Sequence, residues 1–379
     1  MAAGTATRGD PGATVPGPRR HLGRRGVIPH PPELHFERPA ECQATLPPEL
    51  RGVGRDDVRL LVTRGDAVEH HRFADLPSLL RPGDLLVAND SATVPASLQG
   101  YLPARLGASP FVLNLSTRYG ARFWLAEPRS GVGEPGPLAL LPGDEVRLGA
   151  TGGLRARMVA PHPGLERLWF VTFETAVEPR LAQLGRPIRY AHVAQDLPLA
   201  SYQTVFARVP GSAEMPSAGR PFTRRVLRAL AERGVEIATV TLHTGVSSLE
   251  LDGPIERATL FAEPFVVPAL SAEAVNRCRA HGGRVVAVGT TVVRALESAV
   301  RGGHLRPMRG FTRRFVRPGQ FRGSVDGIVT GLHDPGASHL ALLHAVAGGP
   351  AVRASYAEAV ANGYLWHEFG DVHLALPAA

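Results

Sequence analysis

The feature that most constrains the fold is a change of hydrophobic pattern along the 379-residue chain. Residues 33–96 and the residues after 200 combine short apolar runs with segments of helical periodicity, as in α/β proteins whose strands are covered on both faces. Residues 97–199 instead contain short segments of alternating apolar and polar residues, separated by Gly/Pro turns. Such spacing favours an antiparallel barrel or sandwich. We therefore expect an α/β domain formed by 33–96 and 200–379, with a β domain and linker inserted at 97–199.

The composition narrows the class of protein and of partner. No run approaches the ~20 apolar residues of a membrane span, and the N-terminus has no signal-peptide core. Cys42 and Cys278 are the only cysteines, so we expect a soluble protein of the reducing cytoplasm. The formal charge is +8, and all 42 basic residues are arginine, a balance that favours a polyanionic partner such as nucleic acid. Residues 1–32 are rich in Arg, Gly and Pro and are predicted to be a disordered tail.

Polar residues follow several of the apolar runs. In parallel α/β architectures ligands bind at the carboxyl ends of the strands, so a shared crevice is expected there. The runs end in Asn89-Asp90-Ser91, His243-Thr244-Gly245, Gly289-Thr290-Thr291 and His333-Asp334-Pro335.

The segment after residue 284 predicts a strand that turns directly into a helix. Val285–Val288 is wholly apolar and Gly289 interrupts it. Thr290 or Thr291 is then a candidate N-cap, because a hydroxyl can accept a hydrogen bond from the amides of the next turn. With Arg294 one turn later, this helix N-terminus could hold a carboxylate or a phosphate. The alternative is an ordinary joint between a strand and a helix.

Two further groups of residues could carry chemistry. Tyr202, Gln203 and Thr204 offer an aromatic face, an amide and a hydroxyl in succession, a set that could hold a planar base; by pattern alone a linker between domains is favoured. His243 and His333 each follow a strand and could exchange a proton near neutral pH, or could be structural. The histidine spacings match no recognised ligand pattern, so we expect no metal.

Several motifs occur together and in one order along the chain. They include "LRPGDLLVANDSATVPASLQG" (80–100), "YQTVFARVPGSAEMPSAGRPFT" (202–223), "VTLHTG" (240–245), "VVAVGTTVVRALES" (285–298) and "VRPGQFRGSVDGIVTGLHDPGAS" (316–338). From Phe36 to Leu376 the chain resembles the queuosine-pathway S-adenosylmethionine:tRNA ribosyltransferase-isomerases.

This resemblance implies a barrel-like α/β catalytic domain with an inserted antiparallel β-barrel. It implies an enzyme that uses S-adenosylmethionine as a ribosyl donor, with tRNA as the acceptor, and we expect a monomer. In the implied reaction a proton leaves the ribose carbon beside the sulfonium, adenine departs, and the amine of a deazaguanine base attacks. Methionine is then expelled as an epoxide-bearing cyclopentane forms.

By resemblance, site residues can be assigned to candidate roles. The catalytic candidates are His243, His333 and Asp326. The candidates for binding the substrate are Tyr202, Gln203, Thr204, Ser217, Gly219, Thr290, Thr291 and Arg294.

Some site loops depart from the family pattern. Ala92 and Ser97 stand where arginines are expected, and Pro221 stands where a histidine is expected. Two alternatives therefore stay open. One is an S-adenosylmethionine-using enzyme with a small-molecule acceptor. The other is a non-catalytic homologue that binds RNA or another ligand.

Overall fold

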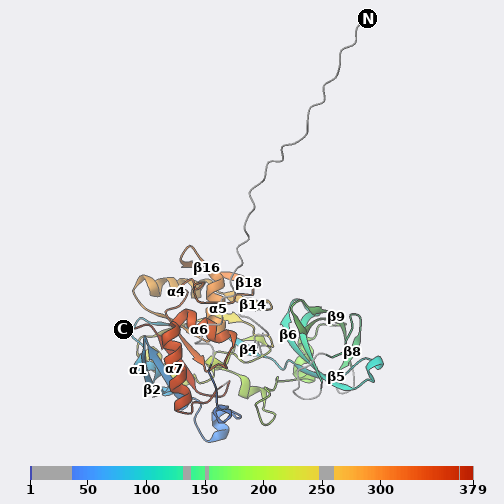
Figure 1. Ribbon diagram of the computed structural model, residues 1–379, viewed down its shortest axis with the longest axis horizontal. Helices are drawn as coiled ribbons and strands as arrows, with labels where there is room; N and C mark the ends of the chain where they lie inside the picture. Colours follow the sequence, from blue (N-terminus) through green and yellow to red (C-terminus); the bar gives the residue numbers. More distant parts are fainter. Residues whose placement is uncertain (2–35, 131–137, 150–152, 247–259, 367, 379) are drawn as a thin grey trace.

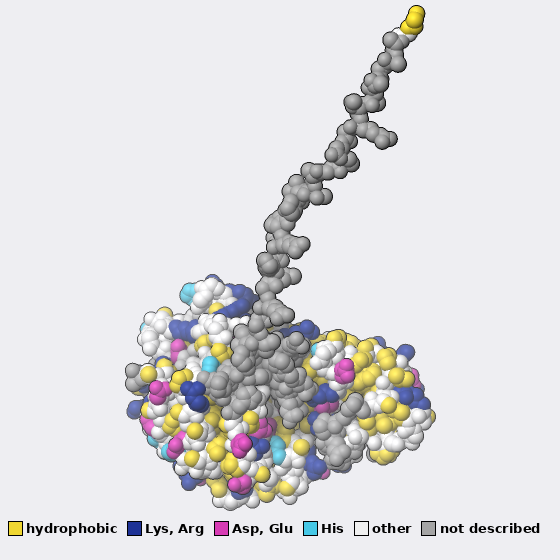
Figure 2. Space-filling model, viewed as in Figure 1, with side chains coloured by type: hydrophobic (Ala, Val, Ile, Leu, Met, Phe, Trp, Pro, Cys, Tyr) yellow, Lys and Arg dark blue, Asp and Glu magenta, His cyan; other side chains and the backbone are white. Residues whose placement is uncertain are grey.

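The computed structural model describes Met1 and residues 36–130, 138–149, 153–246, 260–366 and 368–378. These residues form an α/β body and a smaller β-barrel beside it (Figure 1). Arginine side chains are spread over the visible face of both bodies (Figure 2). Among the described residues no helix is both long enough and apolar enough to span a bilayer. The predicted tail, apart from Met1, lies outside the described residues.

The α/β body is built on one nine-stranded sheet. Its order is β18 (Met308–Thr312), β14 (Glu263–Val267), β13 (Glu236–Leu242), β3 (Leu85–Asn89), β15 (Val285–Val288), β19 (Gly327–Gly331), β20 (Val372–Leu376), β1 (Arg59–Arg64) and β2 (Ala67–Arg72). The four strands from β13 to β19 are mutually parallel. Their carboxyl ends therefore share one edge of the sheet. Strand β20 is antiparallel to β19, so its first residues lie at the same edge.

Helices cover both faces of this sheet because its central strands are apolar on both sides. Alternate residues of β3 point to opposite faces: Leu85 and Val87 join one core cluster, and Leu86 and Ala88 join another. The first cluster includes side chains of α4 (Ala269–Ala280), α5 (Thr290–Ala299), α6 (Ser338–Ala347) and α7 (Gly349–Ala361). The second includes side chains of α1 (Leu76–Leu79) and α3 (Arg224–Glu232).

The inserted segment forms a closed antiparallel barrel. Its six strands follow one another as β5 (Ser97–Tyr101), β6 (Pro110–Arg118), β7 (Phe123–Ser130), β10 (Leu165–Phe173), β9 (Leu154–His162) and β8 (Glu145–Leu148). A pairing of β8 with β5 closes the ring. The α/β class and the inserted β-barrel are thus confirmed. The division of the chain at residues 97 and 199 into separate domains stays a prediction.

Short elements join the two bodies and complete the fold. After the barrel come α2 (Glu178–Leu184) and β11 (Gly185–Arg186), which pairs with β5. Strand β4 (Ser91–Thr93) pairs in parallel with β12 (Val209–Ser212). A small hairpin is formed by β16 (Val300–Arg301) and β17 (His304–Leu305).

The predicted N-cap of α5 is wrong. Gly289 occupies the cap position, and no side chain caps this helix. Its φ of 95° and ψ of 154° turn the chain sharply, a conformation that only glycine adopts without strain. Thr290 is consequently the first helical residue. By contrast, Thr223 caps α3, with its hydroxyl accepting a bond from Val226 N at 3.3 Å.

A buried histidine predicts how stability changes with pH. His373 of β20 is fully buried, with Nε2 2.8 Å from Thr63 Oγ1, and burial lowers its pKa to about 4. An unfolded histidine titrates near pH 6.5, so between these values the unfolded chain binds a proton that the folded chain does not. We expect the stabilising contribution present above pH 6.5 to be lost as pH falls, at roughly 1 kcal/mol per pH unit.

Urea unfolding between pH 4 and 7 measures this slope. His373→Gln should flatten it, whereas replacing the exposed His281 with Gln should not. An equal slope in the His373 variant would contradict the assignment.

Candidate functional site

One buried amide ties together three of the strand ends predicted to meet. Asn89 is the last residue of β3 and is 3% exposed. Its Oδ1 accepts bonds from Leu242 N at 3.0 Å and Ser91 N at 3.1 Å. Its Nδ2 donates to Leu242 O at 2.8 Å and Thr291 Oγ1 at 3.3 Å. The ends of β3, β13 and β15 are therefore held at fixed relative positions.

His243, directly after β13, is connected to a network of hydroxyl groups. Its Nδ1 lies 2.7 Å from Ser91 Oγ, which lies 2.6 Å from Ser212 Oγ. The β4–β12 pairing brings these serines together, and Ser212 Oγ also accepts a bond from Thr244 N at 3.1 Å. A Cβ at Gly211 would lie only 2.7–2.8 Å from the imidazole ring. Hydroxyl groups therefore lie at the Nδ1 edge of the imidazole, and the backbone at Gly211 packs against the ring.

The environment of His243 suits proton transfer. Burial lowers its pKa below the usual value near 6.5, although the Asp90 carboxylate opposes this. The ring is therefore neutral at pH 7. While Nδ1 bonds to Ser91, Nε2 has no hydrogen-bond partner in the described part of the chain. A general base requires an imidazole that is fixed in position and has one nitrogen available to accept a proton.

Arg294 supports the loop that follows His243. Its Nη1 donates to Glu263 Oε2, and its Nε donates to Arg314 O at 3.1 Å. Glu263 is 3% exposed, and its Oε1 accepts a bond from Gly245 N at 2.9 Å. This differs from the expected role, since the guanidinium is already paired with a carboxylate of the protein. Its contacts connect α5 to the loop that follows His243.

The start of α5 provides donors at the same edge of the sheet. The first amides of a helix have no intrahelical acceptor, and here they belong to Thr290 and Thr291. A Cβ at Gly289 would lie 3.3 Å from the Ala218 side chain. The short 3₁₀ segment Ser217–Gly219 therefore lies against this turn. The structure brings Ser217, Gly219 and the two threonines to one place.

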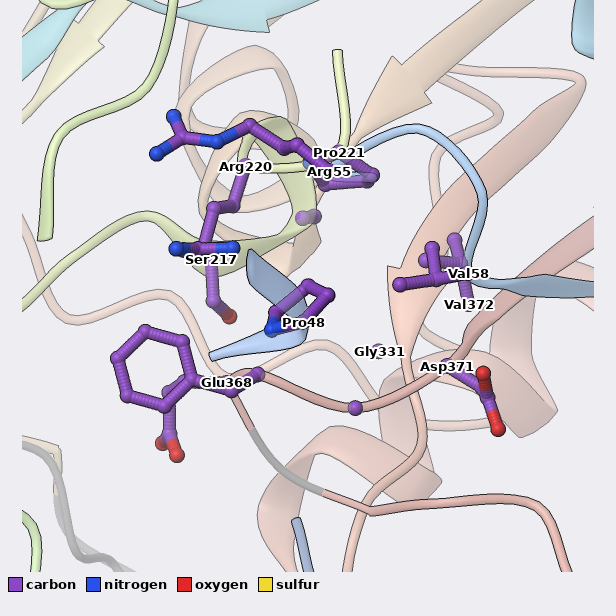
Figure 3. A pocket seen from close by; sticks show the side chains of 13 residues that line it. Pro48, Arg55, Val58, Ser217, Arg220, Pro221, Gly331, Glu368, Asp371 and Val372 are labelled. Carbon is purple, nitrogen blue, oxygen red and sulfur yellow. The ribbon is translucent and has the colours of Figure 1, made fainter. Parts of the chain in front are cut away.

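A small pocket adjoins this segment (Figure 3). Its lining includes Ser217, Pro221, Gly331 and residues 368–372. Its cavity volume is about 20 Å³, room for about one water molecule. A nucleoside can enter there only if the lining segments move apart.

Sequence reasoning missed the ion pair that the buried Arg220 forms with the exposed Glu49 beside the pocket. Arg220 is 2% exposed and donates to Glu49 Oε2 at 2.9 Å and to Ser201 O at 3.1 Å. Its guanidinium lies 4.8 Å from the centre of the Phe369 ring. Burial lowers the pKa of Arg220 to about 10. With arginine so abundant, no sequence signal distinguished this one.

The three residues considered able to hold a planar base, Tyr202, Gln203 and Thr204, are engaged in internal contacts. The Tyr202 ring is buried in an apolar cluster. Gln203 Oε1 accepts a bond from Thr93 N at 3.1 Å, and its Nε2 donates to Thr93 O at 2.8 Å. Thr204 Oγ1 accepts a bond from Phe206 N at 3.2 Å. These contacts favour the linker interpretation of this segment over a base-binding role.

The other two catalytic candidates lie at opposite edges of the sheet. His333 follows β19, with Nε2 2.8 Å from Thr330 Oγ1 and its ring stacked on His339 at 4.5 Å. Asp326 instead precedes β19, and its Oδ2 accepts a bond from Val285 N at the start of β15. A five-residue strand is roughly 15 Å long, which separates Asp326 from the strand ends. Its position does not support a catalytic role.

In the described part of the chain no group of three or more His, Cys, Asp or Glu side chains is arranged to hold a metal ion.

Comparison with known proteins decides the family. A family model described as "Queuosine biosynthesis protein" matches residues 32–375. The chain belongs to this queuosine biosynthesis family. The resemblance of its motifs is thereby confirmed.

Individual members of the queuosine biosynthesis family match over nearly their full length. The S-adenosylmethionine:tRNA ribosyltransferase-isomerase of Anaeromyxobacter sp. (strain Fw109-5) is 39% identical over 90% of this chain and 97% of its own. The enzyme of the same name from Deinococcus radiodurans is 38% identical, over 90% and 93%. A crystal structure of S-adenosylmethionine tRNA ribosyltransferase from Thermotoga maritima is 27% identical, with a TM-score of 0.51, over 91% of this chain and 100% of that chain.

Proposed function

We propose that this protein is an S-adenosylmethionine:tRNA ribosyltransferase-isomerase of queuosine biosynthesis. It transfers and isomerises the ribosyl moiety of S-adenosylmethionine onto a deazaguanine base in tRNA. The named relatives at 38–39% identity support this assignment. The observation that carries the proposal is the neutral, held imidazole of His243 at the strand ends, beside the free amides of α5.

His243 is the base in the first step of this reaction. The sulfonium of the substrate acidifies the neighbouring ribose carbon, and His243 Nε2 accepts the proton from it. The resulting imidazolium is stabilised because its Nδ1–H donates to Ser91 Oγ, at the distance of 2.7 Å observed in the structure. Loss of adenine, attack by the amine of the acceptor base and expulsion of methionine complete the exchange.

The start of α5 is proposed to hold the carboxylate of the methionine moiety. The amides of Thr290 and Thr291 and the helix dipole both favour an anion there. Arg294 contributes indirectly, because it fixes Glu263 and thereby the loop after His243. This role of Arg294 as a positioning residue replaces the direct contact expected from the sequence.

The remaining parts of the assignment concern the setting of the reaction. We propose that the reaction takes place in the cytoplasm and that the protein acts as a monomer. The sulfonium of S-adenosylmethionine activates the ribosyl group that is transferred. The formal charge of +8 supports a polyanionic substrate.

Calorimetric titration with S-adenosylmethionine tests the proposal at its first step. Saturable binding of one donor per chain is expected. Thr290→Pro removes one amide at a helix position that tolerates proline and should weaken this binding. A chain that is folded and binds no donor would count against the proposed function.

The lowered pKa of His243 predicts the acid side of the pH profile. A base must be unprotonated, so kcat should fall as the pH decreases through a value below 6.5. Single-turnover rates between pH 5 and 8 measure it, with circular dichroism at each pH to confirm the fold. A rate that already falls at pH values well above 6.5 would disagree with this assignment.

A further inference from the structure

An exposed aromatic surface lies where the barrel meets the α/β body. Phe311 of β18 is 52% exposed and stacks on Tyr119, with ring centres 5.5 Å apart and planes at 29°. Phe123 of β7 is 38% exposed and stacks on Phe170 of β10 at 5.7 Å and 10°. Tyr119 also lies 6.1 Å from Phe123. These four rings form one continuous group, the Phe311 surface.

Two arginines flank the exposed ring in the sequence, Arg309 on β18 and Arg313 directly after it. One residue separates Arg309 from Phe311 on β18, so their side chains point to the same face of the strand. Both arginines are exposed, and neither side chain has an ion pair or a hydrogen bond in the described ranges. The charge of Arg313 acts on both Tyr119 and His162, so it lies close to the rings.

The fold does not account for this arrangement. Strand β18 is at the edge of the sheet, and arginines there help to prevent pairing with another chain. An exposed phenylalanine between them instead favours association with another molecule, because it leaves apolar surface in water. Contiguous exposed apolar side chains mark binding surfaces. Flat rings with unpaired cations around them suit a ligand that has both aromatic faces and negative charges.

The Phe311 surface is continuous with the loop that carries His243. Phe261 belongs to the cluster in which Tyr119 and Phe170 pack. A Cβ at Gly245 would lie only 2.5 Å from the Phe261 ring, so that ring contacts the backbone two residues after His243. A molecule bound on the exposed rings therefore lies next to the segment that holds the proposed base.

We propose that the Phe311 surface binds unpaired bases of an RNA loop, with Phe311 and Phe123 stacking on the bases and Arg309 and Arg313 contacting the phosphates. Single-stranded loops are recognised in this way because their bases can stack on aromatic side chains, whereas the bases of a duplex are enclosed. The proposal rests on the proposed function and specifies which part of the tRNA meets which part of the protein.

Fluorescence anisotropy with a labelled tRNA stem-loop tests the proposal. Phe311→Ala should weaken binding about 5- to 150-fold, the loss of one stacked base. Arg313→Gln should reduce the slope of log affinity against log salt by about 0.7. A duplex RNA of equal length should show no effect of the Phe311 substitution.

Matched controls are available elsewhere on the chain. Tyr101 is 43% exposed on β5, across the barrel ring from β10, and Tyr101→Ala should bind the stem-loop like the wild type. Arg228 is exposed on α3, on the other face of the sheet from α5, and Arg228→Gln should keep the salt slope. Donor binding by the Phe311 variant, measured by calorimetry, confirms that it is folded.

The outcomes separate this inference from the proposed function. If Phe311→Ala binds the stem-loop as tightly as an active wild type, the inference is wrong and the proposed function is unaffected. If the wild type binds the loop through Phe311 but modifies no tRNA, the surface is supported and the proposed function is wrong. An effect of Phe311→Ala on duplex and stem-loop alike would also overturn the inference.

Discussion

Replacing His243 with alanine is expected to lower kcat about 10²- to 10⁴-fold, the usual contribution of a positioned general base. The pKa lowered by burial, the bond from Nδ1 to Ser91 and the free Nε2 support the proposal that this residue removes the proton. Binding of S-adenosylmethionine should change much less, because the amides of α5 are untouched. Single-turnover release of adenine measures the rate, and calorimetry measures the donor affinity.

The exposed His281 is the matched control, and His281→Ala should keep the wild-type rate. Ser91→Ala should give a smaller loss than His243→Ala, because it removes only the partner of the imidazole. A His243→Ala variant that is folded, binds the donor and reacts within about threefold of the wild type would show that another group removes the proton.

Replacing Asn89 with alanine is expected to destabilise the protein by about 2–5 kcal/mol. The substitution leaves the buried N–H and C=O groups of Leu242 without partners, and each unsatisfied group costs roughly 1–3 kcal/mol. It also releases Thr291 and Ser91, so His243 and the start of α5 lose their fixed separation. We expect turnover to decrease even at temperatures where the variant stays folded.

Urea unfolding gives the loss of stability, and the rate at a low temperature gives the loss of activity. Gln99→Ala is the matched control, since Gln99 is an exposed amide on β5 and its loss should change stability by less than about 0.5 kcal/mol. An Asn89 variant as stable and as active as the Gln99 variant would show that Asn89 does not join the strand ends.

The strands and the meeting of their ends could be predicted because they depend on local pattern. A continuous apolar run such as Val285–Val288 fits a strand covered on both faces, and the structure buries all four residues. The alternation by itself predicted a barrel or a sandwich, and the pairing of β8 with β5 shows that the strands close into a barrel. Pairing between strands that are distant in the sequence does not change the local hydrophobic periodicity, so it could not be predicted from that periodicity.

The internal partners of the site could not be predicted for the same reason. Ser212 lies 121 residues from Ser91 in the sequence, and Arg220 lies 171 residues from Glu49. Nothing in a loop sequence shows which hydroxyl or cation will be enclosed by the fold. Gln203 looked like a ligand-binding residue because its amide is polar, yet both ends of that amide are bonded to the backbone of Thr93.

The most direct test of the central claim is mass analysis after incubation of the protein with S-adenosylmethionine and a tRNA that carries the deazaguanine base. We predict that the tRNA gains the rearranged ribosyl group and that one adenine and one methionine appear for each modified tRNA. Adenine and methionine released without modified tRNA would contradict tRNA as the acceptor and indicate a small-molecule acceptor. Intact donor and unchanged tRNA would contradict the enzymatic assignment itself.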